Sequence, residues 1–134
     1  MQMEWSDGKK RCCWANPKNE RYIRYHDEEW GVPVYDDGKL FEMLVLECFQ
    51  AGLSWECVLN KREAFREAFD GFDLETVCAY GKDKLEALVR DPGIIRNRLK
   101  IQAAVTNARV YCEIVYRHLK SAKTLPPQKC GSVF

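Results

Sequence analysis

The chain has 134 residues, of which 46% are hydrophobic and 12% aromatic, so it is long enough for one modest folded domain and too apolar to be disordered throughout. A formal net charge of +1 excludes a global electrostatic attraction to nucleic acids or membranes, so any such contact must come from a local patch. No apolar run approaches the roughly 20 residues of a membrane span, and the opening residues carry charges where a signal peptide is apolar, so we expect a cytoplasmic protein without membrane contact.

The first half of the chain predicts a flexible stretch over residues 1–10 and then helices. In the predicted helix 20–30, Tyr22, Tyr25 and His26 stand at i, i+3 and i+4 and therefore share one face. Residues 39–50 are apolar nearly all round, which indicates a buried helix, and the length of the run favours a helix over a strand. Residues 54–69 predict a third helix, with Ser54 as its cap.

The second half predicts two short helices, over residues 74–80 and 82–90, and then one long one. From Ile94 to Leu119, apolar residues recur at steps of three and four, which indicates an amphipathic helix lying across the others. We expect an irregular tail over residues 120–134. The pattern as a whole predicts an all-α domain over residues 11–119.

Glu47 raises the first question about function, because it lies in an apolar run just before a Gly-Leu-Ser-Trp turn. A buried carboxylate needs a partner, which is either internal or a ligand. Flat rings around one acceptor could sandwich a planar, cationic or amino-bearing heterocycle. The alternative is that the rings belong to the core and that Glu47 bonds an internal N–H or a tyrosine hydroxyl. The candidate aromatic residues are Trp14, Tyr22, Tyr25, Trp30 and Trp55.

Cys12 and His26, with Cys13 nearby, are candidate zinc ligands, since thiolate and imidazole suit that ion. A tetrahedral site needs four ligands, and their spacing matches no compact zinc finger. His118 and Cys130 could complete the set only if the tail folds back. Seven cysteines without a secretory segment otherwise indicate reduced thiols, and a packed histidine beside buried thiols is the open alternative.

Two further features could contact nucleic acid. The basic cluster Arg90, Arg96, Arg98 and Lys100 surrounds a Pro-Gly break and could hold phosphate, although such clusters are commonly a solvated helix face. The turn at Gly52 and Leu53 could present an apolar wedge to base steps, or could equally be a buried loop anchor.

Three runs taken together resemble a known family: "RCCW", "YHDEEWGVPVYDDGKLFEMLVLECFQAGLSWECVLNKREAFREAF" and "DPGIIRNRLKIQAAVTNARVY". They are similar to DNA-3-methyladenine glycosylase I, over about residues 11–112. The resemblance implies an all-α fold of the helix-hairpin-helix glycosylase superfamily. It also implies a base excision repair enzyme that flips 3-methyladenine out of alkylated double-stranded DNA and hydrolyses its N-glycosidic bond.

The resemblance also implies roles for single residues. Glu47 would accept hydrogen bonds from the alkylated base, Tyr25 would add a contact and Trp55 would stack on the ring. Gly52 and Leu53 would fill the gap left in the duplex, beside the DNA contacts expected from Arg96 and Arg98. Tyr22, Trp14 and Trp30 would line the pocket, and Cys12 and His26 match the first two ligands of a structural zinc ion.

The likeness fades after Tyr111, where the family continues with a DNA-gripping hairpin and two more zinc ligands. We therefore expect a chain truncated or altered at its C-terminus, with an incomplete zinc site and weaker, more salt-sensitive DNA binding. Helices that lose a packing partner also lead us to expect a homodimer. The alternatives to an enzyme are a non-catalytic remnant that binds a base, a metal or a protein, and a cysteine-based redox sensor. The vicinal pair Cys12-Cys13 lacks the spacer of a redox motif.

Overall fold

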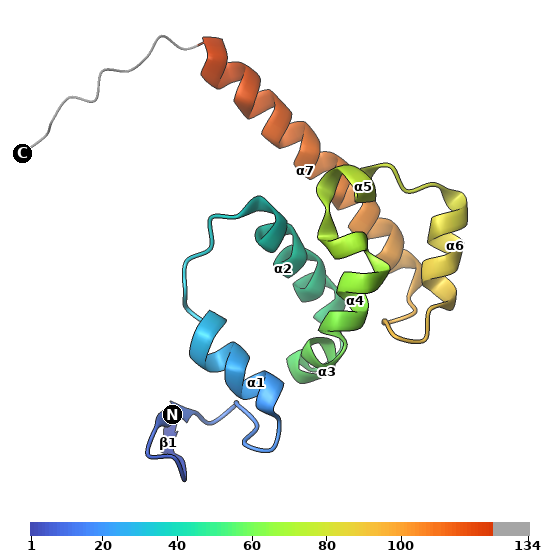
Figure 1. Ribbon diagram of the computed structural model, residues 1–134. Helices are drawn as coiled ribbons and strands as arrows, with labels where there is room; N and C mark the ends of the chain where they lie inside the picture. The colour runs from blue at the N-terminus through green and yellow to red at the C-terminus, as the bar shows by residue number, and fades with distance from the viewer. Residues whose placement is uncertain (125–134) are drawn as a thin grey trace, which may run out of the picture.

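The computed structural model describes the backbone of residues 1–124 and the side chains of residues 1–118, and it is mostly helical. Figure 1 shows the helices α2 to α7 gathered around one core, with α1 and the N-terminal strands at one end and the last turns of α7 projecting from the other. This confirms the predicted helical fold. No helix within the described residues is long and apolar enough to cross a membrane.

The N-terminus differs from the prediction of a flexible stretch over residues 1–10. The strands β1 (Gln2–Glu4) and β2 (Lys10–Cys12) pair antiparallel, with Met3 opposite Arg11. The Asp7-Gly8 pair makes the reversal, because Gly8 adopts φ +75° and the Asp7 carboxylate accepts the Lys9 N–H at 3.1 Å. This end of the domain is therefore a hairpin.

The segment predicted as one helix over residues 20–30 is two elements. The helix α1 (Glu20–Arg24) begins at Asn19, whose side chain caps it, and a π-helical turn, η1 (Tyr25–Glu29), follows directly. The next helix, α2 (Asp37–Gln50), starts under an Asp36 cap, in which Oδ1 accepts the Lys39 N–H at 2.8 Å. The predicted helix is confirmed, with its start two residues earlier, but it is buried on one side only, since Leu40 and Leu44 are 40% and 41% exposed.

The predicted helix 54–69 breaks at Lys61 (φ −98°, ψ 0°) into α3 (Trp55–Asn60) and α4 (Arg62–Ala68), and Ser54 caps α3 as expected. A 3₁₀ turn, η2 (Asp70–Phe72), leads into α5 (Leu74–Cys78), and α6 (Lys82–Arg90) follows. These short helices change the chain direction often and bring the aromatic residues of α2, α4 and η2 together.

The long helix α7 (Arg98–Thr124) starts four residues later than predicted, because residues 91–97 form a loop and Asn97 caps the helix through the Lys100 N–H at 3.1 Å. Residues 120–124, assigned to the irregular tail, are helical, and residues 125–134 lie outside the described residues. As expected, α7 lies across other helices, contacting α2, α5 and α6.

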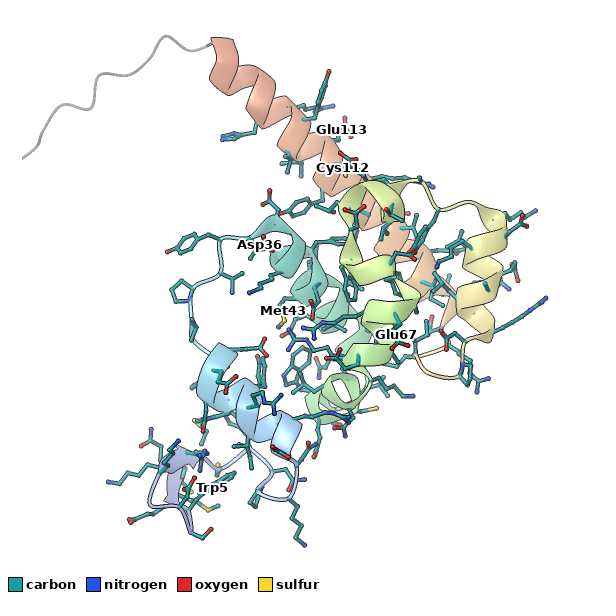
Figure 2. All side chains as sticks on the ribbon, in the orientation of Figure 1. Trp5, Asp36, Met43, Glu67, Cys112 and Glu113 are labelled. Atoms are coloured by element: carbon teal, nitrogen blue, oxygen red, sulfur yellow. The ribbon has the colours of Figure 1, made fainter. Side chains whose placement is uncertain are left out.

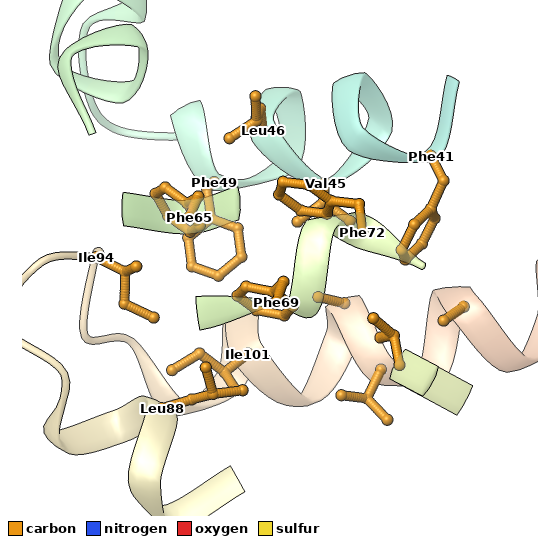
Figure 3. Close-up of a cluster of buried hydrophobic side chains, with 14 of the residues drawn as sticks. Phe41, Val45, Leu46, Phe49, Phe65, Phe69, Phe72, Leu88, Ile94 and Ile101 are labelled. Carbon is orange, nitrogen blue, oxygen red and sulfur yellow. The ribbon is translucent and has the colours of Figure 1, made fainter. Parts of the chain in front are cut away.

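Five phenylalanines form the centre of the core between α2, α4, η2 and α7 (Figure 3). The rings of Phe49 and Phe65 meet edge to face at 4.8 Å, and those of Phe69 and Phe72 stack at 5.6 Å. On α7, Ile101, Ala104, Val105 and Ala108 close the core from below. A rigid core of this kind fixes α2, whose opposite face carries Glu47.

Candidate functional site

The predicted aromatic residues gather in one cluster at the α1 end of the molecule. Trp14 lies at its centre, with its ring centroid 5.4 Å from those of Tyr22 and Trp30 and 6.5 Å from that of Tyr25. Tyr25 in turn meets Trp55 edge to face at 5.4 Å. The structure therefore brings all five candidates together from four segments of the chain.

Polar contacts of Glu56 hold this cluster to α3. The side-chain amides of Asn16 and Asn19 donate to Glu56 Oε1 at 2.8 and 2.7 Å. Because Asn19 also caps α1, and Glu56 follows Trp55 directly, the first turns of α1 and α3 are fixed relative to one another. The same carboxylate acts on Tyr22: burial first, and the Glu56 charge second, raise the pKa of the Tyr22 hydroxyl.

Glu47 is not buried, which differs from the prediction, and the internal partner left open as an alternative is not seen among the described residues. It lies on the exposed side of α2, and it makes no hydrogen bond or ion pair with any residue that the structure describes. Its charge still reaches the cluster, because burial first and Glu47 second raise the pKa of the Tyr25 hydroxyl. The carboxylate therefore lies near Tyr25 with its acceptor capacity free.

Trp55 provides a hydrogen-bond donor without a partner, whereas Glu47 provides an acceptor. Its indole Nε1 is buried and has no hydrogen-bond partner among the described residues. The indole N–H lowers the pKa of the neighbouring Tyr25 hydroxyl without reaching hydrogen-bonding geometry. A buried donor without a partner is costly, and such groups are common where a ligand binds. The cluster thus combines flat rings, an unpaired donor and an unpaired acceptor.

Cys12 and His26 also come together. The Cys12 backbone N–H donates to His26 Nε2 at 3.2 Å, and His26 Nδ1 lies 2.9 Å from Asp27 Oδ1, so the proton is assigned to Nδ1. The Arg11 guanidinium, and after it His26, holds the pKa of Asp27 well below its usual range. Among residues 1–118, whose side chains are described, no three Cys, His, Asp or Glu side chains gather as a metal site.

The other two proposed zinc ligands are not brought to this place. His118 belongs to the projecting part of α7, at the opposite end of the molecule from the N-terminal hairpin (Figure 1), and Cys130 lies outside the described residues. Cys13 is exposed beside Cys12. The described residues therefore supply two zinc-type donors, Cys12 and His26, at one place.

The Gly52-Leu53 turn follows α2 and points away from the core. Ala51 (φ −52°, ψ 119°) and Gly52 (φ +79°) have the backbone angles of a type II turn, which requires a positive φ at its second central residue. The turn is closed by the Leu53 N–H, which donates to Gln50 O at 2.7 Å. Leu53 is 38% exposed, so part of its apolar surface is accessible at the turn.

Two residues of the basic cluster, Arg98 and Lys100, are held by groups of the protein itself. The guanidinium of Arg98 pairs with Glu86, with Nη2 3.0 Å from Oε2. The Lys100 ammonium donates to backbone carbonyls at the end of α2 instead of facing solvent. Arg96 is exposed on the loop before α7. Of the two arginines proposed to contact DNA, Arg96 is therefore the less constrained.

Sequence reasoning missed a buried ion-pair network between η1, α2 and α4. The carboxylate of Glu42 is 7% exposed and accepts from Arg62 Nε at 2.5 Å and from Arg66 Nη2 at 2.9 Å. The same Arg62 reaches Glu29 through Nη1 at 2.7 Å, and its Nη2 lies 3.9 Å from the sulfur of Met43, labelled in Figure 2. The i, i+4 spacing of Arg62 and Arg66 was the available signal.

Next to this network, a recess of about 400 Å³ opens under the loop of residues 32–36. Neither Glu47 nor Trp55 lines it, so it is separate from the aromatic cluster. Its walls combine apolar loop residues with charged groups of both signs: Val32, Pro33, Val34, Tyr35, Met43, Lys39, Arg62, Arg66, Glu28, Glu29 and Asp36.

Comparison with known proteins agrees with the resemblance inferred from the sequence. The family model for methyladenine glycosylase matches residues 14–125, so the prediction that the likeness fades after Tyr111 is wrong. The chain is 52% identical to DNA-3-methyladenine glycosylase 1 of Escherichia coli over 105 residues, which cover 78% of this chain and 56% of the relative. It is 42% identical to DNA-3-methyladenine glycosylase of Haemophilus influenzae over 124 residues, which cover 92% of this chain and 60% of the relative.

Solved structures agree in fold. A crystal structure of 3-methyladenine DNA glycosylase I superposes with a TM-score of 0.77 at 47% identity, covering 81% of this chain and 59% of that one. The Staphylococcus aureus 3-methyladenine DNA glycosylase I superposes with a TM-score of 0.72 at 40% identity, covering 75% of this chain and 53% of that one. In each of these comparisons the chain spans somewhat more than half the length of its relative.

Proposed function

Because this chain belongs to the methyladenine glycosylase family, we propose that it is a DNA N-glycosylase that excises 3-methyladenine from alkylated double-stranded DNA in the cytoplasm. The observation that carries the proposal is the pair of unsatisfied groups in the aromatic cluster, the Glu47 carboxylate and the buried Trp55 N–H. A solved relative, 40% or less identical, holds 3-methyladenine itself. A methylated adenine supplies an amino donor for Glu47, ring-nitrogen acceptors for an N–H donor, and a flat ring that can stack on the aromatic side chains.

In this proposal each residue of the cluster has a role in binding. Glu47 accepts hydrogen bonds from the base, which is positively charged while attached to the sugar, and Tyr25 adds a further contact. Trp55 stacks on the ring, which for an aromatic side chain and a base contributes roughly 1–3 kcal/mol. Trp14, Tyr22 and Trp30 complete the wall. The Tyr25 hydroxyl stays protonated at neutral pH, because burial and nearby Glu47 raise its pKa.

The chemistry then follows from differential binding. Water attacks the sugar C1′, the C1′–N bond breaks, and its electron pair leaves with the cationic base, which becomes neutral, while the attacking water loses a proton to solvent. Since the leaving group needs little protonation, the residues of the cluster act by holding the separating base and by tolerating positive charge on the sugar. A charge-assisted contact from Glu47 strengthens when water is displaced from the cluster by the flipped nucleotide.

The turn after α2 supports a contact with the duplex. Leu53 is exposed at its tip, and an apolar side chain inserted between base steps can hold the gap from which the damaged nucleotide has been flipped. Gly52 provides the positive φ that the turn needs, with open space where a Cβ would lie. We propose backbone phosphate contacts for Arg96 and Arg98, with Arg98 first giving up its ion pair with Glu86.

We also propose that Cys12 and His26 hold one side of a structural zinc ion. The donor set fits in part: Asp27 fixes the proton on His26 Nδ1, as for ligating histidines, but Nε2 accepts the Cys12 backbone N–H and would have to exchange that hydrogen bond for the ion. Zinc would supply structural cross-linking there and no step of the reaction. Two further ligands are required, and the described residues do not gather them at this place.

We also propose that two copies of the chain form a homodimer. Ile114 is 62% exposed on the projecting part of α7, and Val110, one turn earlier, is 47% exposed. A second copy that covered this stripe would remove apolar surface from water. Light scattering of the purified chain across a concentration series tests this, and a constant monomer mass contradicts it.

The function itself is tested by the release of free 3-methyladenine from methylated duplex DNA at low salt. We expect release by the chain and a loss of roughly 10- to 150-fold in Glu47→Gln, the range for removing a hydrogen bond to a charged group. The matched control is Glu67→Gln, an exposed glutamate of α4 away from the cluster. No release from a chain shown to be folded would reject the enzyme and favour a non-catalytic base-binding remnant.

A further inference from the structure

The Arg62 side chain connects the elements that carry the proposed base site. It belongs to α4, and its two ion pairs run in different directions, from Nε to Glu42 on α2 and from Nη1 to Glu29 at the end of η1. Glu42 lies little more than one helical turn before Glu47, and Glu29 ends the turn that begins with Tyr25. One guanidinium therefore spans the gap between the element that presents Tyr25 and the helix that presents Glu47.

The element η1 is attached to the domain by ring packing at Tyr25 and by two ion pairs, Asp27 with Arg11 and Glu29 with Arg62. None of its residues is buried, so the core does not fix it. π-helical turns are rare and are found mostly at functional sites, where they place a side chain that a regular helix would not. Among the described residues, Arg62 is the ion-pair partner of Glu29 and so joins the last residue of η1 to α4.

The two ends of the network differ in redundancy. Glu42 accepts from Arg66 as well as from Arg62, so loss of Arg62 leaves it with a charged partner. Glu29 is 39% exposed in its side chain and is paired through Arg62. Removing either Arg62 or Glu29 is therefore expected to release η1 while α2 and the core stay in place.

We propose that Arg62 is a positioning residue for the base site, acting through its ion pair with Glu29 to hold Tyr25 opposite Glu47. The proposal rests on the proposed function of this cluster. A planar guanidinium can bind two carboxylates in fixed directions at once, whereas a lysine ammonium is a point charge that does not reproduce this fork. The ion pair of Arg62 with Glu29 therefore fixes the position of Tyr25, and the charge of Arg62 alone would not do so.

An alternative role for Arg62 is purely electrostatic, and the two roles predict different results. The Glu29 charge raises the pKa of the Tyr25 hydroxyl and the Arg62 charge lowers it, so Glu29→Gln and Arg62→Met shift this pKa in opposite directions. If the electrostatic potential at the Tyr25 hydroxyl governed base binding, one variant would bind the base more tightly and the other more weakly. If positioning governs it, both variants weaken binding.

The test measures binding of free 3-methyladenine by isothermal titration calorimetry for wild type, Glu29→Gln, Arg62→Met and the double variant. We expect each single variant to lose roughly tenfold in affinity and the double variant to lose no more than Arg62→Met alone, as for residues that act as one unit. Arg62→Lys should not restore wild-type affinity. Glu63→Gln, which breaks an exposed pair with Arg66 on the same helix, is the control and should bind as wild type does.

Thermal unfolding of each variant distinguishes a displaced side chain from an unfolded chain. Glu29 is 39% exposed in its side chain, and Glu29→Gln is expected to keep the midpoint temperature of unfolding of the wild type. Wild-type affinity in Arg62→Met and Glu29→Gln, or affinity changes of opposite sign, would overturn the proposal. If wild type itself neither binds nor releases the base, the proposed function fails, and the NMR signals of the Tyr25 ring then decide. A common displacement in both variants supports positioning, and unchanged signals overturn it.

Discussion

The ammonium of Lys100 donates hydrogen bonds to the carbonyl oxygens of Phe49 at 2.9 Å and of Ala51 at 2.6 Å. These carbonyls end α2, where the helix dipole carries partial negative charge. Lys100 belongs to the first turn of α7, so this contact fixes the Gly52-Leu53 turn to the longest helix of the molecule. A residue that the sequence assigned to phosphate binding is therefore a helix cap.

We predict that Lys100→Met destabilises the fold by about 1–3 kcal/mol, because two carbonyls lose a charged donor and the side chain keeps a similar length. Urea unfolding at neutral pH, followed by far-UV circular dichroism, measures this. Lys18→Met, at an exposed lysine, is the control and should change stability by less than about 0.5 kcal/mol. Equal stabilities of the two variants would show that the cap contributes nothing.

The core predicts a larger effect for Phe49→Ala. The Phe49 side chain is fully buried, and its ring contacts those of Phe65 at 4.8 Å and Phe69 at 6.3 Å. Truncation of such a side chain costs roughly 3–5 kcal/mol, from lost burial and from the cavity left behind. Tyr35→Ala, at a ring that is 90% exposed, should be nearly neutral in the same urea titration. A small effect for Phe49→Ala would contradict the placement of the core.

Acid should weaken the N-terminal end of the fold through Asp27. Its hydrogen bond with Arg11, and then that with His26, lowers the pKa of Asp27 in the folded chain, whereas the unfolded value stays near about 4. The contribution to stability is therefore fully present above pH ~4 and is lost as the pH falls below it, since the unfolded chain then binds the proton first.

The corresponding experiment compares the unfolding free energies of wild type and Asp27→Asn between pH 6 and pH 2.5. The variant should be less stable than wild type at pH 6, because the buried Arg11 is then left with one carboxylate partner, Asp7. The difference in unfolding free energy between the two proteins should shrink toward pH 2.5. A difference that is constant across this range would mean that the Asp27 carboxylate is not held ionised by Arg11.

Leu53→Ala should separate duplex contacts from base contacts. The side chain lies at the tip of the turn, outside the aromatic cluster, so affinity for the free base should not change. Binding to duplex DNA that contains the lesion should weaken by roughly 5- to 30-fold, the equivalent of about 1–2 kcal/mol for lost apolar burial. Fluorescence anisotropy with a labelled duplex measures it, and an unchanged duplex affinity would remove Leu53 from the interface.

Much of the helical fold was predictable, because periodicity and capping act locally. Ser54 marked the start of α3, and the apolar run of α2 indicated a helix correctly, although one face of this helix is exposed at Leu40, Leu44 and Glu47. The break at Lys61 and the π-helical turn at Tyr25 were not predictable, since both depend on how helices pack and not on any helix-breaking residue. The N-terminal hairpin was missed although Asp7-Gly8 is a turn signal for it.

The residues of the aromatic cluster could be predicted from the sequence, but the burial and the partners of its carboxylates could not. Spacing placed Tyr22, Tyr25 and His26 on one face, and the structure brings the rings together. The apolar neighbours of Glu47 suggested a buried carboxylate, yet they lie on the other faces of α2 and the buried carboxylate is Glu42. Helical periodicity alone cannot tell which acidic residue meets a cation from another helix.

Calorimetric titration of free 3-methyladenine into the purified chain shows whether the cluster of Glu47, Tyr25 and Trp55 binds this base. We predict one site per chain, weakened roughly tenfold or more in Trp55→Ala and in Glu47→Gln, with Glu67→Gln unchanged. Absence of binding to the folded wild-type chain, or binding that neither cluster variant alters, would contradict the account.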